Sequence, residues 1–234
     1  MKTLVLMPTY NEADGIVHSL DHLLRVNQQV DVLIIDDNSP DGTADLVEGV
    51  AKGSARVSLL KREGKEGLGK AYLAGYRWGL AAGYQRLVQM DADGSHRPED
   101  LSKLLDSESP LVIGSRWVSG GAVENWPLHR QLISRFGNWY AAVATGLKVR
   151  DLTAGFRVYS AELIQELQLS DLEAQGYGFQ VEMTRRVAKL GVEITEVPIT
   201  FIERESGASK MTREIVLEAF WLCTKWGIQR LFRR

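Results

Sequence analysis

Two carboxylates with a single residue between them follow an apolar run of the sequence. The run Leu87-Val88-Gln89-Met90 predicts a buried strand, and Asp91-Ala92-Asp93 comes directly after it. Mg²⁺ and Mn²⁺ prefer such oxygen ligands, and two carboxylates leave coordination positions open for a diphosphate. A metal held there would neutralise the charge on a departing nucleoside diphosphate. Asp91 and Asp93 are therefore candidate metal ligands, although the tripeptide alone is also typical of a solvated turn.

Two other loops with polar residues should open beside this one. Pro8-Thr9-Tyr10-Asn11-Glu12 and Asp36-Asp37 each close a predicted strand. Because ligands bind at the carboxyl ends of strands in open α/β sheets, we expect both loops at the edge that carries Asp91. An aromatic ring, a carboxylate and backbone groups can hold a base and a ribose there. Asn11 can also cap a helix, and Asp41-Gly42 can form an Asx turn, which does not exclude binding.

The second half of the chain supplies candidate phosphate ligands with positive charge. They are Arg116, Arg130, Arg135, Arg204 and Lys210. Each alone is typical of a solvated surface charge. They form a phosphate site only if the fold brings them together.

A glycine-rich segment resembles a nucleotide-hydrolase motif but lacks one essential residue. Gly64-Lys65-Glu66-Gly67-Leu68-Gly69-Lys70-Ala71 matches the phosphate-binding loop except at its last position. That position normally supplies a hydroxyl ligand to magnesium, which Ala71 cannot do. The first predicted strand is also followed by no G-x-G-x-x-G pattern. We therefore reject both a nucleotide hydrolase and a dinucleotide-binding protein.

The elements that must position these residues alternate between strands and helices. Apolar runs predict strands at residues 3–7, 30–35, 56–60 and 86–90, with amphipathic segments after the first and around 44–52 and 69–82. This alternation predicts an α/β domain with a mostly parallel central sheet. Beyond residue 110 we expect a strand at 111–114, a helix at 128–146 and a strand at 192–202.

Size and composition favour one domain without nucleic-acid chemistry. The chain has 234 residues, 44% of them hydrophobic, and a net charge of −2 from 28 Lys and Arg against 30 Asp and Glu. This balance gives no global attraction to nucleic acid. We expect a single domain over 1–234, with a nucleotide-sugar half at about 1–110, an acceptor half at about 111–213 and an amphipathic helix at 214–234.

The chain shows no signal peptide and no apolar window long enough to span a membrane. The single cysteine, Cys223, suits a reducing compartment, so we expect a cytoplasmic protein. The last segment combines Trp221, Trp226 and Phe232 with arginines at 230, 233 and 234. It predicts a helix that lies at a bilayer interface or packs against the domain.

With these residues in hand, the chain resembles family 2 glycosyltransferases of the GT-A fold, and among them the dolichol-phosphate or polyprenol-phosphate mannose synthases. The resemblance runs from Pro8 to about Met211. Its motifs are Pro-Thr-Tyr-Asn-Glu at 8–12, Ile-Asp-Asp-Asn-Ser-Pro-Asp-Gly-Thr at 35–43, Gly-Leu-Gly at 67–69, Met-Asp-Ala-Asp-Gly-Ser-His at 90–96, Gly-Ser-Arg-Trp at 114–117, Asp-Leu-Thr-Ala-Gly-Phe-Arg at 151–157, Gly-Phe-Gln-Val-Glu-Met at 178–183, Glu-Val-Pro-Ile-Thr-Phe at 196–201 and the segment 204–210.

The resemblance implies a role for each matching residue. The nucleotide pocket would be lined by Pro8, Tyr10, Glu12, Ile35 and Asp37, the donor contacted by Asp91 and Ala92, and the metal bound by Asp93. Donor and acceptor phosphates would be held by Arg116, Arg204 and Lys210, with Arg130 and Ser134 as further acceptor contacts. Some members use a glutamine two residues past the second aspartate as a metal ligand, whereas this chain has Ser95, so water would complete the shell.

The implied reaction transfers mannose from GDP-mannose to a polyprenyl or dolichyl monophosphate, with Mg²⁺ or Mn²⁺ as cofactor. A lipid phosphate is already an anion, so no general base is needed, and direct attack would invert the anomeric centre. Many relatives carry C-terminal transmembrane helices that are absent here. The chain would therefore act peripherally at the cytoplasmic face of a membrane, attached to the surface or to a small membrane-anchoring partner.

Three alternatives stay open at this point. A UDP-sugar of the glucose or N-acetylglucosamine type would be the donor in the first. The second is a non-catalytic nucleotide-sugar-binding subunit, which we would expect to lack Asp93 or the distal cations. The third is transfer to a sugar hydroxyl, which needs a carboxylate base, for which Asp151 or Glu182 are candidates.

Overall fold

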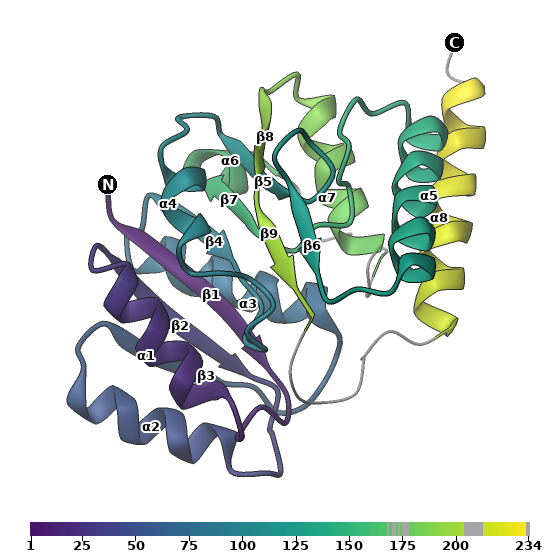
Figure 1. Ribbon diagram of the computed structural model, residues 1–234. Helices are drawn as coiled ribbons and strands as arrows, with labels where there is room; N and C mark the ends of the chain where they lie inside the picture. The colour runs from purple at the N-terminus through teal and green to yellow at the C-terminus, as the bar shows by residue number, and fades with distance from the viewer. Residues whose placement is uncertain (168, 170–171, 173, 175–177, 204–212, 233–234) are drawn as a thin grey trace.

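A seven-stranded sheet runs through the centre of the molecule (Figure 1). The computed structural model describes residues 1–167, 169, 172, 174, 178–203 and 213–232. The strands of the sheet are β1 (Thr3–Thr9), β2 (Val30–Asp36), β3 (Val57–Lys61), β4 (Arg86–Gln89), β5 (Leu111–Ser115), β7 (Arg157–Ser160) and β8 (Ile194–Pro198). Their order is β3-β2-β1-β4-β7-β5-β8, so both halves of the chain contribute to one sheet.

Most neighbouring strands are parallel, which confirms the predicted α/β architecture. β1 pairs in parallel with β2 and β4, β2 with β3, and β5 with β8. The exception is β7, which lies antiparallel between β4 and β5. The sequence pattern did not predict β7, because its sequence Arg-Val-Tyr-Ser offers only two apolar residues. Its first residue, Arg157, is fully buried and donates to the backbone carbonyls of Leu152, Ala154 and Gln180.

Helices cover both faces of the sheet. They are α1 (Ile16–Val26), α2 (Thr43–Gly53), α3 (Leu68–Ala81), α4 (Asp100–Leu105), α5 (Leu128–Thr145), α6 (Ala161–Glu166), α7 (Gly178–Lys189) and α8 (Arg213–Leu231). Side chains alternate between the faces of a strand. Val5 and Met7 accordingly pack with buried residues of α1, α2 and α4, whereas Leu4 and Leu6 pack with those of α3, α6 and α7.

Two glycines allow α3 to approach the sheet closely. A Cβ atom at Gly75 would lie 2.5 Å from Cδ1 of Ile35, and one at Gly79 would lie 2.5 Å from Cδ2 of Leu87. Atoms cannot pack at such distances, so any side chain at these positions would push the helix outward. The absence of a side chain therefore sets the distance between α3 and the strands below it.

A small second sheet, β6 (Ala122–Glu124) with β9 (Thr200–Ile202), lies beside the first. The single strand expected over 192–202 is therefore wrong in one respect, because it divides into β8 and β9 at Ile199. The Ile199 amide donates to the carbonyl of Ser115 at 3.1 Å, and its carbonyl accepts from the amide of Ala122 at 3.0 Å. This one residue is thus hydrogen-bonded to the ends of both sheets.

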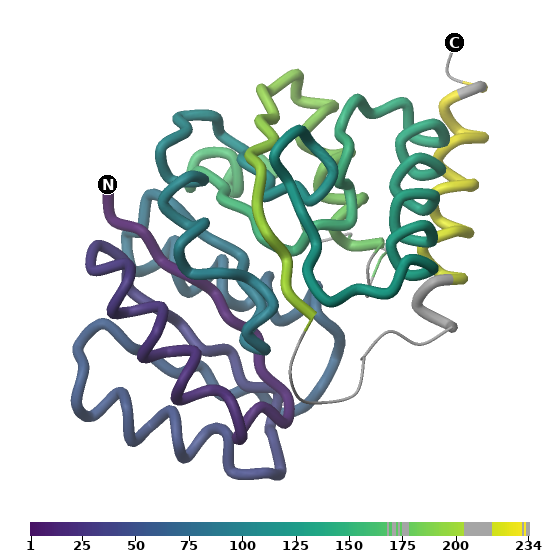
Figure 2. Tube along the Cα trace, in the orientation of Figure 1, coloured from purple at the N-terminus to yellow at the C-terminus, as the bar shows by residue number. Residues whose placement is uncertain are grey.

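The last helix, α8, packs beside α5 (Figures 1 and 2). The two helices run in the same direction, since Tyr140 stacks on Phe220 at 4.3 Å between ring centroids and Arg230 reaches the carbonyl of Val143. Leu222, Cys223 and Trp226 are buried on the inner side of α8, among core residues of the domain. Of the helices described, none combines the length and apolar character that a membrane span requires.

Candidate active site

The loops that follow β1 and β2 are hydrogen-bonded to each other at the carboxyl edge of the sheet. Asp36, at the end of β2, accepts hydrogen bonds from the hydroxyls of Thr9 at 2.9 Å and Ser39 at 2.6 Å. The backbone amides of Asn11 and Glu12 donate to the hydroxyls of Ser39 and Thr43. Asn11 has a φ of 58°, a left-handed conformation that asparagine tolerates. The two loops expected to hold a nucleotide therefore form one ordered unit.

Asp37 and Tyr10 lie in this unit beside basic residues. Asp37 forms an ion pair with Arg62, which also binds Glu66. Burial raises the pKa of the Asp37 carboxyl, and Arg62 opposes that increase. The Lys65 ammonium lies 4.4 Å from the centroid of the Tyr10 ring. Lys65, from the segment that resembled a nucleotide-hydrolase motif, and Arg62, just before that segment, thus lie at the edge where a nucleotide was expected.

Ile35 and Pro8 contribute to this edge differently from the polar residues. The Ile35 side chain is fully buried against α3. Only its backbone can therefore contribute to a nucleotide pocket. Pro8 is partly buried within β1 and lies opposite Ile35 in the parallel register.

The acidic loop follows β4 at the same edge. The Asp91 carboxylate is 37% exposed, whereas Ala92 is buried and its carbonyl accepts a hydrogen bond from Ser19. Asp93 accepts from the amide of Ser95 at 3.1 Å. The Ser95 hydroxyl is buried and has no hydrogen-bond partner in the described part of the chain. This turn therefore presents two carboxylates and one more oxygen, which is the donor chemistry of a magnesium or manganese site.

These oxygens would supply only part of a coordination shell. No group of three or more His, Cys, Asp or Glu side chains suited to a metal occurs among the described residues. A divalent cation on Asp91 and Asp93 would therefore take its other ligands from a diphosphate or from water.

His96 holds the acidic loop through a hydrogen bond to its backbone. No functional role was assigned to this residue from the sequence. Its Nδ1 accepts a hydrogen bond from the Asp91 amide at 3.0 Å. The ring is 1% exposed and stacks on Phe156 at 5.0 Å. Burial lowers the pKa of His96, so the ring is neutral at pH 7, with its proton on Nε2. No sequence pattern signals this role, because it depends on a turn that brings residue 96 back to residue 91.

Arg116 lies at the end of β5 in a buried ion pair. Its backbone amide and its Nε both donate to one oxygen of Asp151, at 2.9 and 2.8 Å, and its Nη2 donates to the other at 2.7 Å. The side chains are 8% and 0% exposed. Thr153 accepts a further bond from Nη2 at 3.0 Å. Asp151 therefore orients the guanidinium that we expected to bind phosphate.

Aromatic rings surround Arg116 and bring two other arginines toward it. Its guanidinium carbon lies 5.6 and 5.5 Å from the ring centroids of Trp117 and Trp126. Arg130 stacks over Trp126 at 4.1 Å and Arg135 over Trp117 at 4.5 Å. The Nε1 atoms of both tryptophans are buried and lack a hydrogen-bond acceptor among the described residues. Hydrogen-bond donors and positive charges thus gather here, as an anion site requires.

Two of the residues expected to bind the acceptor lie on α5. Arg130 pairs with Glu203. Ser134 lies one turn further along the helix, where its backbone carbonyl accepts from Asn138. Asn138 in turn bonds Thr153, the residue that contacts Arg116. The first turns of α5 are therefore connected to the Arg116 cluster.

Phe201 of β9 joins the acidic loop to the arginine cluster. Its ring meets His96 edge-on at 5.3 Å and Trp126 edge-on at 5.4 Å. The Arg116 guanidinium carbon lies 5.4 Å from the same ring. Phe201 thus contacts both His96, which binds the Asp91 amide, and Arg116 of the arginine cluster.

Two carboxylates considered as bases for a hydroxyl acceptor are in the wrong environment for that role. Asp151 is fully buried and binds Arg116. Glu182 is 2% exposed and accepts from Arg186 and the amide of Ala174. Neither carboxylate can reach an acceptor, because each is enclosed and paired. The interpretation of Asp151 or Glu182 as a general base is therefore wrong.

Arg204 and Lys210, expected to hold phosphates, lie outside the described residues. Glu203, the last described residue before Arg204, pairs with Arg130, and the described residues resume at 213. Their roles stay predictions.

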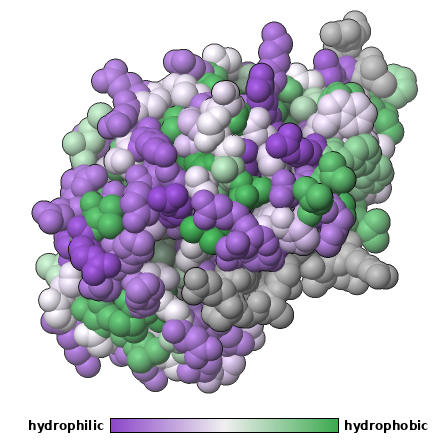
Figure 3. Space-filling model, viewed as in Figure 1, coloured by the Kyte–Doolittle hydropathy of each residue, from purple (hydrophilic) through white to green (hydrophobic). Residues whose placement is uncertain are grey.

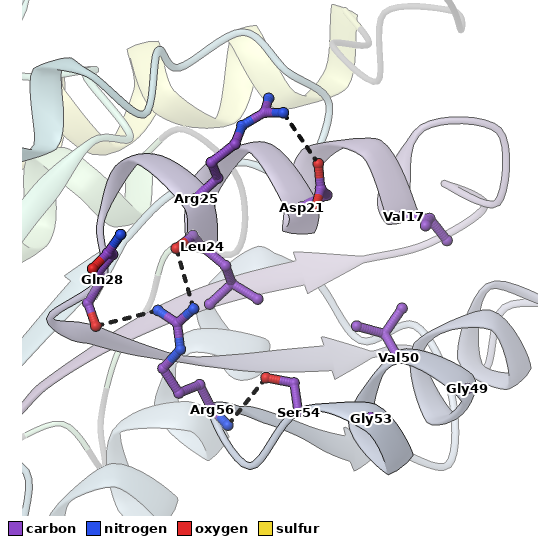
Figure 4. A pocket seen from close by; sticks show the side chains of 10 residues that line it. All are labelled: Val17, Asp21, Leu24, Arg25, Gln28, Gly49, Val50, Gly53, Ser54 and Arg56. Atoms are coloured by element: carbon purple, nitrogen blue, oxygen red, sulfur yellow. Dashed lines mark hydrogen bonds and ion pairs between the residues drawn. The ribbon is translucent and has the colours of Figure 1, made fainter.

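A separate groove runs between α1 and α2 (Figure 4). The charged side chains that line it already have partners within the protein. Asp21 pairs with Arg25, and the Arg56 guanidinium donates to the backbone carbonyls of Leu24 and Gln28. Gln28 and Arg56 precede β2 and β3, so this end of the groove lies at the amino ends of the strands. The groove is therefore distinct from the site at the carboxyl edge.

Comparison with protein families and characterised sequences identifies close relatives. The model of "Glycosyl transferase family 2" matches residues 4–168. An "Undecaprenyl-phosphate mannosyltransferase" of Micrococcus luteus is 49% identical over 97% of this chain and 95% of its own length. A "Polyprenol monophosphomannose synthase" of Mycolicibacterium smegmatis is 45% identical over 97% of this chain and 88% of its own length.

Solved structures share the fold at lower identity. Glucosyl-3-phosphoglycerate synthase from Mycobacterium tuberculosis, in complex with Mn²⁺, uridine diphosphate and phosphoglyceric acid, has a TM-score of 0.68 and 20% identity. The match covers 95% of this chain and 78% of the other. The same enzyme in complex with phosphoglyceric acid gives a TM-score of 0.70 at 19% identity. The expected GT-A fold is thereby confirmed.

Proposed function

Because the chain belongs to glycosyl transferase family 2, we propose that it transfers mannose from GDP-mannose to a polyprenyl monophosphate, giving polyprenyl-phosphate mannose. Two relatives of nearly equal length, named for mannose transfer to such lipids, support this substrate pair. A non-catalytic subunit is disfavoured, because Asp91, Asp93 and Arg116 are all retained in a connected site.

The observation that carries the proposal is the pairing of an acidic turn with a cluster of one guanidinium and two buried indole N–H groups. Asp91 and Asp93 suit a metal-bound diphosphate, and Arg116 with the buried indole N–H groups of Trp117 and Trp126 suits a second anion. Phe201 connects the two sets, because its ring contacts His96 beside the acidic turn and Arg116 in the cluster. A reaction between two phosphorylated substrates needs this arrangement, since their anions repel each other until cations neutralise them.

Asp93 and Asp91 would hold Mg²⁺ or Mn²⁺, with the buried Ser95 hydroxyl as a further oxygen in the same turn. When bound, the metal supplies Lewis-acid stabilisation of the departing nucleoside diphosphate. His96 keeps the Asp91 backbone in place through its Nδ1, so the carboxylate needs no reorganisation when the donor binds.

The chain's own residues would then orient the two substrates. Tyr10, Glu12 and Asp37 line the edge that receives the nucleotide, with the backbones of Pro8 and Ile35 beside them. Arg116, held by Asp151, and Arg130 would direct the acceptor phosphate, with Ser134, Arg204 and Lys210 as further contacts. The phosphate oxygen attacks the anomeric carbon opposite the diphosphate, which inverts that centre and requires no protein base.

We place the reaction at the cytoplasmic face of a membrane, with the chain bound peripherally to the surface or to a small membrane-anchoring partner. The acceptor is a lipid, so its phosphate lies at the level of the headgroups. The single cysteine, Cys223, is buried and free, which suits a reducing compartment.

A panel of donors tests the proposal. Purified protein is incubated with GDP-mannose, GDP-glucose, UDP-glucose or UDP-N-acetylglucosamine, with Mn²⁺ or Mg²⁺ and a short polyprenyl phosphate, and lipid-linked sugar is measured. We expect product from GDP-mannose only, and loss of at least about a hundredfold in rate for Asp93→Asn. Asp21→Asn removes an exposed carboxylate far from the site and should keep the full rate. Preferred use of a UDP-sugar would refute the donor assignment, and no product with any donor would refute the activity.

A further inference from the structure

Two buried polar atoms beside the candidate active site take no part in the proposed chemistry. In the described chain, five buried side-chain nitrogen or oxygen atoms lack a hydrogen-bond partner. Those of Ser95, Trp117 and Trp126 belong to the acidic turn and to the arginine cluster. The other two are the Tyr72 hydroxyl and the Oε1 atom of Gln180. An unpaired buried polar atom destabilises a protein, so each of the two calls for a partner that the described chain does not supply.

Both atoms belong to helices that begin at the carboxyl edge of the sheet. α3 follows β3, and α7 precedes β8, which is parallel to β5, so both helices start at this edge. Tyr72 is the fifth residue of α3, and Gln180 is the third residue of α7. The Tyr72 ring stacks on Phe179, the neighbour of Gln180, with 6.1 Å between the ring centroids. Tyr72 is fully buried and Gln180 is 2% exposed, so other residues form the surface drawn in Figure 3.

Both side chains are connected to the acidic turn after β4. The Nε2 atom of Gln180 donates to Oε1 of Gln89 at 2.9 Å, and Gln89 lies two residues before Asp91. Burial raises the pKa of the Tyr72 phenol, and the negative charges of Asp91 and Asp93 raise it further. The Tyr72 hydroxyl therefore keeps its proton at neutral pH and lies within electrostatic reach of both carboxylates.

The chemistry of the two atoms suits hydroxyl groups rather than an anion. The Oε1 atom of Gln180 only accepts hydrogen bonds, whereas the Tyr72 hydroxyl can donate and accept. A fully ionised phosphate has no proton to offer to Oε1, and the carboxylates of Asp91 and Asp93 repel it unless a cation intervenes. A sugar hydroxyl both donates and accepts, so it can pair with each of the two atoms.

The order of the strands brings Gln180 to the region between the two anion sites. β7 lies between β4, which leads to the acidic turn, and β5, which leads to Arg116. A Cβ atom at Gly155, just before β7, would lie 3.6 Å from both carboxylate oxygens of Asp91. Arg157, the first residue of β7, donates to the Gln180 carbonyl at 3.0 Å. A hexose that passes from a diphosphate to an acceptor phosphate must lie between these two anions, and it is the part of the substrates for which the proposed site has no partner.

We propose that the Tyr72 hydroxyl and the Gln180 amide oxygen bind hydroxyl groups of the transferred hexose and so select the sugar. This inference rests on the proposed function, because the hexose is that of the proposed donor. Both atoms are enclosed by protein, so the sugar reaches them when neighbouring side chains move, as in an induced fit. A buried polar group that binds a substrate hydroxyl discriminates against a sugar without that hydroxyl, because the group is then left unpaired.

Binding of GDP-mannose compared with GDP tests the inference without catalysis. Tyr72→Phe removes only the hydroxyl. With Mn²⁺ present, calorimetry should show about tenfold weaker binding of GDP-mannose to this variant, and an unchanged affinity for GDP, which has no hexose. Gln180→Met should show the same selective loss. The matched control Gln89→Met breaks the hydrogen bond between Gln89 and Gln180 but keeps the Gln180 oxygen, so it should retain the wild-type ratio of the two affinities.

The melting temperature separates a hydroxyl that binds substrate from one that stabilises the fold. Tyr72→Phe removes a hydroxyl without a partner in the described chain, so this variant should melt at or above the wild-type temperature. Tyr76→Phe is the control on the same helix. Tyr76 is also buried, but its hydroxyl accepts a hydrogen bond from Gln89 at 2.6 Å. This control should melt at a lower temperature and keep the wild-type ratio of affinities for GDP-mannose and GDP.

Transfer from deoxy donors identifies the hydroxyl that is bound. With a short polyprenyl phosphate as acceptor, wild-type protein should use at least one monodeoxy analogue of GDP-mannose at least about tenfold less efficiently than GDP-mannose itself. Tyr72→Phe should remove the preference for GDP-mannose over that analogue, because the substitution and the analogue delete the same hydrogen bond.

The outcomes distinguish this inference from the proposed function. If Tyr72→Phe weakened the binding of GDP and GDP-mannose equally, weakened neither, or melted as far below wild type as Tyr76→Phe, the hydroxyl would not bind the hexose and the inference would be overturned. Wild-type protein that binds GDP-mannose but forms no lipid-linked product would instead contradict the proposed function.

Discussion

The ion pair between Arg116 and Asp151 provides the sharpest test of how the site is held together. We consider the substitution Asp151→Asn, which keeps the shape of the side chain but removes its charge. The carboxylate is fully buried and accepts three hydrogen bonds from Arg116, between 2.7 and 2.9 Å. The amide retains one acceptor oxygen and turns an NH₂ group toward the donors of Arg116. The positive charge of Arg116, only 8% exposed, then loses its counter-ion.

The expected loss of stability follows from this burial. Removing one partner of a buried ion pair destabilises a protein by about 3–5 kcal/mol, because the remaining charge is left uncompensated. Asparagine still accepts one bond, so we expect the lower end of that range, about 3 kcal/mol. For a chain of this size, that corresponds to a melting temperature lower by about 6–12 °C.

Urea and thermal unfolding, followed by circular dichroism, measure the effect. Asp21→Asn makes the same chemical change in the exposed i,i+4 pair with Arg25, whose side chains are 66% and 70% exposed, and should change stability by less than about 0.5 kcal/mol. If Asp151→Asn were no more destabilising than Asp21→Asn, the charge of Asp151 would contribute nothing. The structural account of Arg116 would then be refuted.

Three further outcomes follow from individual contacts. Gly75→Ala should destabilise the protein by about 1–3 kcal/mol because its Cβ would overlap Ile35, whereas Gly49→Ala, with open space around it, should be neutral or stabilise by up to about 1 kcal/mol in the same urea titration. Burial raises the pKa of the Cys223 thiol from 9.0 to about 11, so at about pH 8 it should resist Ellman's reagent until urea unfolds the protein. The thiol ionises at a lower pH in the unfolded protein than in the folded one, so the free energy of unfolding should fall as pH rises from about 9 to about 11. The variant Cys223→Ala should lack this pH dependence. His96→Phe keeps the ring but leaves the Asp91 amide without its acceptor, and should lower stability by about 1–3 kcal/mol and weaken Mn²⁺ binding measured by calorimetry.

The parts of the fold that were predictable are those whose signals are local. Strands at 3–7, 30–35 and 86–90 are short segments in which apolar residues predominate, and the structure places strands over all three. β7 was not predictable, because only two of its four residues are apolar and its buried arginine has its partners in the preceding loop and in α7. The interruption between β8 and β9 at Ile199 was not predictable either, since the residues on both sides of it have the composition of a strand.

In the candidate site, too, residues marked by a local signal were predictable and residues defined by tertiary contacts were not. Asp91 and Asp93 were recognisable because they adjoin a strong strand signal. Asp151 was mistaken for a possible base, because its pairing with Arg116 joins residues 35 positions apart. The contact of His96 with the Asp91 amide depends on the turn between them. Such roles come from tertiary contacts, and a single sequence does not display them.

The backbone hydrogen bonds of Ile199 affect how the molecule unfolds locally. Its amide and carbonyl are shared between the end of β5 and the start of β6, so neither sheet can lose its terminal pairing there without disturbing the other. Local opening of a protein proceeds in cooperative units that share hydrogen bonds. The small sheet that carries Phe201 is therefore part of the same unit as the end of the central sheet. Backbone protons of Ala122 and Ile199 should exchange with solvent at a common rate, as members of one foldon.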